Sequence, residues 1–161
     1  MKAIVVVDKN WAIGKDGCLL THLSGDLKHF KEKTLDKVVV MGRTTLQSLP
    51  GGKPLPRRTN IVLSTNPDFK ADCIVCKSKD QLFEAIKPYD PEDVFIIGGE
   101  QVYREFLPYT DTVYVTKIDA AFPADRYFVN LDEREEWEPV YESEPQEEAG
   151  ISYRFTEYRR K

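Results

Sequence analysis

The sequence predicts a single α/β domain built on a twisted, mostly parallel sheet of eight strands. Three observations predict this class. Strand-like and helix-like segments alternate up to residue 107, an order that favours parallel strands joined by right-handed crossovers. Several strand-like segments, residues 94–97 above all, are apolar at every position, as in strands buried on both faces. Residues 137–143 and 151–158 instead alternate polar and apolar side chains, which predicts an antiparallel hairpin at one sheet edge.

The expected elements follow these patterns in chain order. Strands are expected at residues 2–7, 37–41, 60–63, 74–76, 94–97, 112–118, 137–143 and 151–158. About four helices are expected to cover both faces, at residues 24–35, 44–49, 79–86 and between Gly99 and Pro108. Residues 11–18 contain two glycines among apolar side chains, and they are expected to form a loop that either covers a site or is simply anchored to the core by Trp11 and Ile13.

Length and composition exclude several classes of protein. The 161 residues suffice for one domain with its own core. The net charge is -4 and basic residues cluster only at 159–161, so nucleic acid is not an expected partner. The apolar run at residues 3–7 is too short for a signal peptide or a membrane span. We therefore expect a cytoplasmic protein without a membrane partner, and a monomer, because no long apolar stripe demands a second chain.

The three cysteines predict neither a disulfide nor a metal site. An odd number fits reduced thiols. Cys73 and Cys76 form a C-x-x-C pair, but in a strand they point to opposite faces. No second pair completes a zinc site, so both are expected to be structural.

Gly98 and Gly99 stand between a buried strand and a helix. A turn without side chains lets a ligand approach the backbone, and the first N–H groups of the helix point at it. Such a site suits the phosphates of a nucleotide, although a tight turn without a ligand fits these residues equally well. Glycines and polar residues follow other expected strands in the same way, and the carboxyl ends of parallel strands meet at one edge of the sheet, where ligands bind. The residues at that edge are Gly14, Gly42, Arg43, Thr44, Ser64, Thr65 and Lys77.

Asp26 has two interpretations. As an acid in the first turn of a helix it favours the helix dipole and needs no other role. As a partly buried carboxylate in a pocket with Leu27 and Phe30, it could bind a cationic or amidine-like group. Arg57 and Arg58 also have two interpretations: they could be a solvated pair, or one of them could hold a carboxylate.

The order of these segments resembles the dihydrofolate reductase family, in its bacterial type, over nearly the whole chain. The similar stretches are residues 12–14 (AIG), 23–31 (LSGDLKHFK), 40–45 (VMGRTT), 54–64 (PLPRRTNIVLS), 96–103 (IIGGEQVY) and 114–116 (YVT). Two departures stand out. Thr21 replaces the tryptophan usual five positions before the acid, which bears on water placement, loop closure and antifolate affinity. Gln101 stands where some relatives carry a basic residue.

The resemblance implies NADPH-dependent reduction of 7,8-dihydrofolate to 5,6,7,8-tetrahydrofolate. Hydride passes from nicotinamide C4 to pterin C6, and water protonates N5. Asp26 and Thr116 are the implied catalytic residues: Asp26 accepts hydrogen bonds from the 2-amino and N3 side of the ring, and Thr116 supports it. Arg58 is expected to pair with the glutamate tail of the substrate through two hydrogen bonds. The implied substrate-binding residues are Val5, Val6, Asp26, Leu27, Phe30, Leu49, Arg58, Ile97, Tyr103 and Thr116.

For NADPH, the resemblance places the 2′-phosphate and adenosine near Arg43, Thr44, Ser64 and Thr65, with Lys77 close by. Thr45 and the turn at 98–103 hold the pyrophosphate, and a cis peptide joins Gly98 to Gly99. A mobile loop closes over the nicotinamide. The implied cofactor-binding residues are Val6, Ile13, Gly14, Leu19, Gly42, Arg43, Thr44, Thr45, Leu63, Ser64, Thr65, Lys77, Ile97, Gly98, Gly99, Glu100, Gln101, Val102 and Tyr103.

Antifolates such as trimethoprim or methotrexate are the implied inhibitors. Two other functions remain open from the sequence: a reductase acting on a pyrimidine-type riboflavin precursor, and a nucleotide-binding module without catalysis. His22 and His29 are both expected at the surface or in loops, away from N5 of the pterin.

Overall fold

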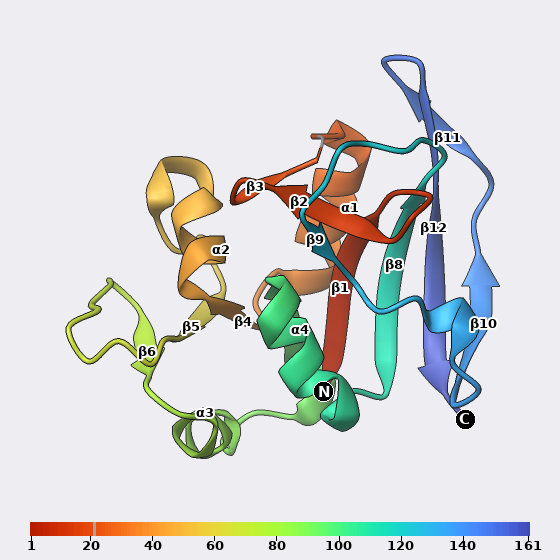
Figure 1. Ribbon diagram of the computed structural model, residues 1–161. Helices are drawn as coiled ribbons and strands as arrows, with labels where there is room; N and C mark the ends of the chain where they lie inside the picture. The colour runs from red at the N-terminus through yellow and green to blue at the C-terminus, as the bar shows by residue number, and fades with distance from the viewer. Residues whose placement is uncertain (21) are drawn as a thin grey trace.

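The computed structural model describes residues 1–20 and 22–161, without the side chains of residues 18 and 19. Its main sheet has the strand order β10-β12-β8-β1-β7-β4-β5-β6, with β11 also paired to β12 (Figure 1). These strands are β1 (Lys2–Val7), β4 (Val38–Gly42), β5 (Thr59–Leu63), β6 (Ile74–Cys76), β7 (Val94–Gly98), β8 (Thr112–Ile118), β10 (Trp137–Glu142), β11 (Gln146–Glu148) and β12 (Ile151–Arg160). The α-helices are α1 (Ser24–Thr34), α2 (Arg43–Ser48), α3 (Lys79–Ile86) and α4 (Glu100–Phe106).

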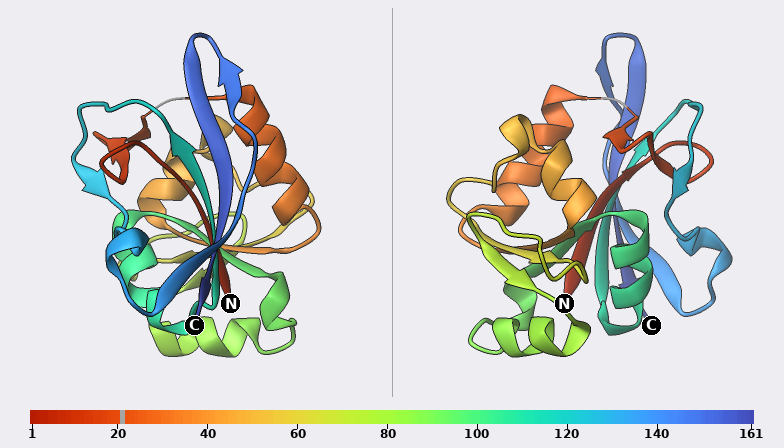
Figure 2. Two further views of the ribbon diagram at one scale, coloured as in Figure 1. Left: turned by 90° about the vertical axis from the view of Figure 1, so that its right-hand side faces the viewer. Right: turned by 60° about the vertical axis from the view of Figure 1, so that its left-hand side comes forward.

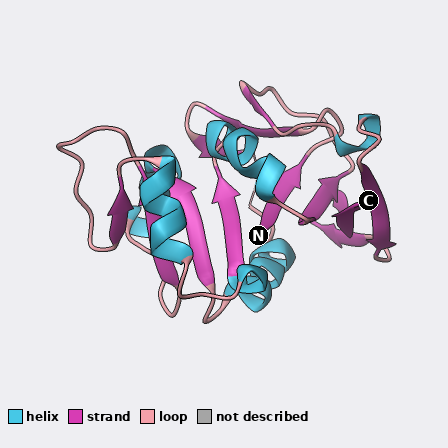
Figure 3. Ribbon diagram, turned by 90° about the horizontal axis from the view of Figure 1, so that it is seen from below, coloured by secondary structure: helices cyan, strands magenta, loops and turns pink. Residues whose placement is uncertain are grey.

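The strand pairing confirms the predicted fold class. Strand β1 runs between β7 and β8, parallel to both, and β4, β5 and β6 continue the parallel order beyond β7. Strand β12 is antiparallel to β8 and to β10, so the C-terminal hairpin lies at the edge as expected. Seen from below, the strands turn progressively across the sheet (Figure 3). Because β1, β4, β5 and β7 are parallel, their carboxyl ends lie at the same edge of the sheet.

Strand β4 shows why the central strands are apolar at every position. Val38 and Val40 pack on the face covered by α3 and α4. Val39 and Met41 point to the opposite face, against Leu46 of α2. A side chain buried this completely stabilises the fold by roughly 1.5–3 kcal/mol, so both faces of the strand hold their helices in place.

Helix α1 lies on the face that also carries α2. Leu23, just before the helix, packs with Ile118 of β8 and Tyr153 of β12. The first turn of α1 lies next to the hairpin formed by β11 and β12 (Figure 2). This packing brings the start of α1 beside β8 and β1, near the carboxyl edge of the sheet.

Residues 11–18 correct one expectation. Instead of a loop they form β2 (Ala12–Lys15) and the first residue of β3 (Cys18–Leu19), which pair antiparallel. The third strand of this small sheet is β9 (Arg126–Tyr127), more than a hundred residues further along the chain. Because the partner is so distant, the local sequence carries no sign of the pairing. We call β2, β3 and β9 the small sheet.

Two further details complete the fold. Strand β11 lies in the segment expected to be a polar loop between the hairpin strands, and it pairs with β12 through residues 146–148. No helix in the described part of the chain is long and apolar enough to cross a membrane.

Candidate active site

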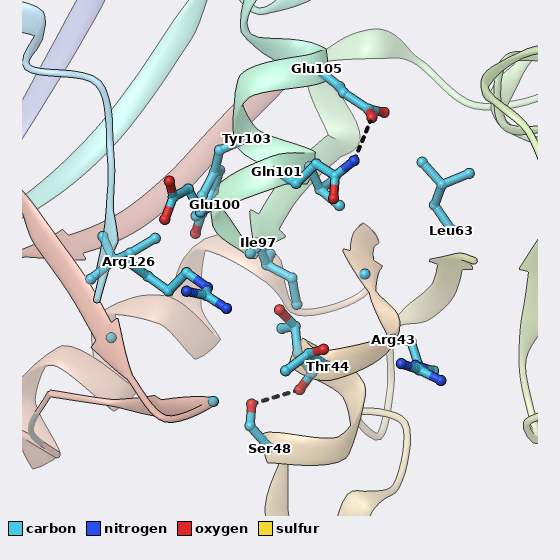
Figure 4. A pocket seen from close by; sticks show the side chains of 18 of the residues that line it. Arg43, Thr44, Ser48, Leu63, Ile97, Glu100, Gln101, Tyr103, Glu105 and Arg126 are labelled. Carbon is cyan, nitrogen blue, oxygen red and sulfur yellow. Dashed lines mark hydrogen bonds between the residues drawn. The ribbon is translucent and has the colours of Figure 1, made fainter. Parts of the chain in front are cut away.

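A cleft of about 1010 Å³ opens at the carboxyl edge of the main sheet. The ends of β1, β4, β5 and β7 form its base, and α2, α4 and the small sheet form its walls (Figure 4). The lining residues are Val5, Val6, Ile13, Gly14, Lys15, Gly17, Gly42, Arg43, Thr44, Thr45, Ser48, Leu63, Ser64, Thr65, Asn66, Ser78, Lys79, Ile97, Gly98, Gly99, Glu100, Gln101, Val102, Tyr103, Glu105 and Arg126. The cleft thus lies at the sheet edge where strand order predicts a ligand site.

The glycine turn after β7 forms part of the cleft floor. The peptide bond between Gly98 and Gly99 is cis, and Gly98 has a φ of 138°, a conformation that favours glycine. A Cβ on Gly98 would lie 3.1 Å from the Thr45 hydroxyl oxygen. A Cβ on Gly42 would similarly lie 3.2 Å from Val102. A side chain at either position would be crowded, and at Gly98 the backbone conformation also disfavours one, so α2 and α4 approach each other closely here.

Cationic and hydroxyl groups stand at the ends of β4 and β5. Arg43 and Thr44 begin α2 directly after β4, and Ser64 and Thr65 follow β5. All four line the cleft. Guanidinium and hydroxyl donors around a cleft of this size fit the charged, elongated shape of a dinucleotide.

Asp26 lies on α1 and faces β8. Its carboxylate oxygen Oδ1 accepts a hydrogen bond of 2.7 Å from the Thr116 hydroxyl. Burial raises the pKa of Asp26 above its usual value, and the hydrogen bond from Thr116 opposes this shift without cancelling it. Thr116 is paired in register with Val6 of β1, a residue of the cleft. The carboxylate is therefore held at the junction of α1, β8 and β1.

Asp26 lies in the first turn of α1 but does not cap the helix. The N-terminus of α1 is capped instead by Glu148 of β11, which accepts hydrogen bonds from the Ser24 backbone N–H (2.8 Å), the Ser24 hydroxyl (2.7 Å) and the Gly25 N–H (3.2 Å). These contacts lower the pKa of the Glu148 carboxyl. Because the cap comes from another strand, Asp26 is not needed for capping, although its place in the first turn still favours the helix dipole.

Tyr103 is a buried residue of the cleft whose phenol feels the charge of Asp26. Its side chain is buried, lines the cleft, and donates a hydrogen bond of 2.7 Å to the Ile4 carbonyl. Burial raises the pKa of the Tyr103 phenol far above its usual value, and the nearby Asp26 charge raises it further. The phenol therefore stays protonated at neutral pH and acts as a neutral wall of the site.

Comparison with known proteins identifies the family of this chain. The family model described as dihydrofolate reductase matches residues 1–160. The chain belongs to the dihydrofolate reductase family. This assignment confirms the resemblance and makes the chain an enzyme of that class.

Individual relatives agree with the family model. The chain is 38% identical to a dihydrofolate reductase of Bacillus subtilis over 161 residues, which is 98% of this chain and 93% of the relative. It is 44% identical to a type 3 dihydrofolate reductase of Salmonella typhimurium over 78% of this chain and 75% of the relative. A solved dihydrofolate reductase from Enterococcus faecalis, complexed with NADP(H) and RAB-propyl, superposes with a TM-score of 0.87 at 36% identity. That alignment covers 99% of this chain and 95% of the other.

Most residues that the resemblance implies for the cofactor line the cleft of this family member. Lys77 does not, because its ammonium group donates hydrogen bonds to the carbonyls of Asn66 (2.7 Å) and Phe69 (2.8 Å). It holds the segment between β5 and β6 instead. The side chain of Leu19 and all of Thr21 lie outside the described residues.

The residues implied for the substrate divide into two groups. Val5, Val6, Ile97 and Tyr103 line the cleft. The others lie on or beside α1, α2 and β8, outside the lining of the cleft: Asp26, Leu27, Phe30, Leu49, Arg58 and Thr116.

The two arginines after the proline-rich stretch differ in their contacts. The Arg58 guanidinium donates hydrogen bonds to the Pro56 carbonyl (2.9 Å) and the Thr34 hydroxyl (3.3 Å). Partial burial lowers the pKa of this group. Arg57 is exposed and pairs with Asp36 at 3.2 Å. Arg58 is thus held in one orientation beside the end of α1, whereas Arg57 forms a surface ion pair.

One expectation about the histidines is corrected. His22 is exposed, but His29 lies within α1 and stacks on Phe155 with ring centroids 4.1 Å apart. Burial lowers the pKa of His29, and Lys33 lowers it further. Neither histidine lines the cleft.

The sequence analysis also missed several cleft residues. Lys15 and Arg126 enter from the small sheet, and Ser78 and Lys79 enter from the start of α3. A polar pair after β6 could have suggested the α3 group. No local pattern could have found Arg126, because its position depends on the long-range pairing of β9 with β2.

Proposed function

We propose that this chain reduces 7,8-dihydrofolate to 5,6,7,8-tetrahydrofolate with NADPH. The observation that carries the proposal is the Asp26 carboxylate, partly buried, bonded to Thr116 and set beside a dinucleotide-sized cleft. Family membership supports the same reaction. The bound dinucleotide supplies the hydride that goes to C6 of the pterin.

Asp26 recognises the ring in this proposal. A carboxylate with a free oxygen accepts hydrogen bonds from the 2-amino group and the N3 side of a pterin, while the Thr116 hydroxyl fixes the other oxygen. Its negative charge in a poorly solvated site raises the proton affinity of the ring. Asp26 thereby favours protonation of N5 without touching it.

Water delivers the proton to N5. Neither histidine, His22 or His29, lines the cleft, and burial raises the pKa of the Tyr103 phenol so that it stays protonated. No described side chain in the cleft thus combines the required pKa with a position beside the ring. Positioning of the two rings accounts for much of the remaining rate enhancement.

The proposed cofactor site consists of residues that line the cleft. Arg43, Thr44, Ser64 and Thr65 would hold the adenosine end and its 2′-phosphate, and Thr45 with the glycine turn would hold the pyrophosphate. Arg58 would hold the glutamate tail of the substrate, because its anchored, planar fork matches a carboxylate. We further propose that the protein acts as a cytoplasmic monomer, inhibited by methotrexate or trimethoprim.

The decisive experiment measures NADPH oxidation by the purified protein. Oxidation is expected only when dihydrofolate is present, and Asp26→Asn is expected to lower turnover at neutral pH on the order of 100-fold or more while the fold is retained. A pyrimidine-type riboflavin precursor should give no oxidation; if it replaces dihydrofolate as the substrate, the proposal fails. NADPH binding without any oxidation would identify a non-catalytic module instead.

A further inference from the structure

Arg126 reaches into the cofactor cleft from the small sheet (Figure 4). Its side chain is 60% exposed. Its guanidinium donates a hydrogen bond of 3.1 Å to the Asp125 carbonyl and lies 3.9 Å from the Asp125 carboxylate. That carboxylate already accepts a hydrogen bond from the Asp16 N–H at 3.1 Å. Most of the N–H donors of Arg126 are therefore free to face a ligand in the cleft.

Strand β9 is fixed on both sides, which fixes the origin of this side chain. On one side Arg126 pairs in register with Gly14 of β2. On the other, the neighbouring Tyr127 N–H donates a hydrogen bond of 3.0 Å to the Glu100 carboxylate at the start of α4. Arg126 consequently starts from a backbone anchored to both walls of the cleft, beside the glycine turn.

The charges of the cleft leave one place without a cation. Helix α4, which follows the glycine turn, contributes Glu100, Gln101 and Glu105 to the lining, two carboxylates and an amide. The basic residue of α4, Arg104, pairs with Glu100 at 3.2 Å and does not line the cleft, so α4 offers no free positive side chain to a phosphate next to that turn. In the proposed function this turn faces the pyrophosphate, so a cation must come from elsewhere.

The other basic groups of the cleft stand at different places. Arg43 begins α2 at the end of β4, beside the hydroxyls that follow β5. The Lys79 ammonium lies 5.5 Å from the ring centroid of Tyr109, beyond the C-terminal end of α4. Lys15 ends β2, at the exposed tip of the hairpin that β2 forms with β3. Of the basic residues that line the cleft in the described part of the chain, only Arg126 starts from a strand bonded to the first residue of α4.

We propose that Arg126 is a phosphate-binding residue for the dinucleotide and that it contacts the pyrophosphate rather than the 2′-phosphate. The inference rests on the proposed NADPH-dependent function. A guanidinium forms charge-assisted, paired hydrogen bonds with phosphate oxygens. Because β9 pairs with β2, this contact also ties the small sheet to the bound cofactor.

The test separates the two phosphate groups by comparing ligands. Arg126→Met is expected to weaken binding of NADPH and NADH by the same factor, roughly tenfold, since both carry the pyrophosphate. Arg43→Met should weaken NADPH much more than NADH. Adenosine 2′-monophosphate, which lacks the pyrophosphate, should bind wild type and Arg126→Met equally. Dissociation constants come from fluorescence titration or calorimetry, without turnover.

Controls make each outcome decisive. Arg134→Met removes an exposed arginine outside the cleft and should change no dissociation constant, and Arg126→Lys should recover part of the affinity. Circular dichroism melts check that each variant is folded. Unchanged NADPH affinity in Arg126→Met overturns the inference, as does a loss confined to NADPH, which would place Arg126 at the 2′-phosphate. If wild type binds no NADPH at all, the proposed function fails instead.

Discussion

At the scale of single residues, the buried Asp26 carboxyl links the stability of the fold to the proposed catalysis. Burial raises its folded pKa, so the fold favours the protonated form and the ionised form is destabilising. This cost is present above the folded pKa and disappears below the unfolded value of about 4. We expect Asp26→Asn to melt at a higher temperature than wild type at pH 7.

The pH dependence of that difference provides the check. As pH falls through the folded pKa of Asp26 and below about 4, wild type and Asp26→Asn should converge in melting temperature, because the carboxyl then carries no charge in either state. Thermal melts from pH 3 to 8 measure this. A variant that is less stable than wild type at pH 7 would contradict the assignment of a costly buried charge.

Thr116 opposes the effect of burial on Asp26. Thr116→Val keeps the shape of the side chain but removes the donor to Oδ1. We expect the pKa of Asp26 to rise further, the pH profile of kcat to shift to higher pH, and stability at pH 7 to fall by about 1–3 kcal/mol. Thr116→Ser, which keeps the hydroxyl, should restore the pKa of Asp26, the pH profile and the stability. An unshifted profile in Thr116→Val would show that the hydroxyl does not act on Asp26.

At the scale of elements, Gly25 sets the distance between α1 and β12. A Cβ at this position would overlap the hydroxyl of Tyr153. Gly25→Ala should therefore displace the start of α1, which carries Asp26, and cost about 1–3 kcal/mol. Adding Tyr153→Phe removes the obstructing oxygen.

Urea unfolding of the four proteins in this cycle tests the prediction. The double variant should recover most of the stability lost in Gly25→Ala, with kcat recovering in parallel, because the two positions are in contact. Additive losses would mean that the cost of the alanine arises elsewhere in α1.

The elements also show what the sequence could predict. The buried strands were predicted because each is a local run of apolar residues, and β4 needs both faces covered wherever it lies. The small sheet was not predicted, because β2 forms a strand by pairing with β9, which is distant in the chain. Arg126 was missed for the same reason. Lys77 was placed at the ligand edge by its position after β6, but only the structure shows its ammonium bonded to Asn66 and Phe69.

At the scale of the whole molecule, the cleft is lined by parts of the chain that are far apart in the sequence. Its lining comes from the main sheet, from helices on both faces and from the small sheet. A dinucleotide bound there would contact all of these parts, and none of that arrangement exists in the unfolded chain. Binding energy therefore becomes folding stability by mass action.

This linkage gives a prediction for the complete fold. At a free NADPH concentration of 100 times the dissociation constant, unfolding should become about 2.7 kcal/mol less favourable, which raises the melting temperature by roughly 5–10 °C in a protein of this size. NADH at the same concentration should give a smaller rise, because it lacks the phosphate expected to bind Arg43. When each dinucleotide is held instead at 100 times its own wild-type dissociation constant, Arg126→Met should reduce both shifts equally. Scanning calorimetry measures all three, and a melting temperature that NADPH leaves unchanged would show that the cleft does not bind it.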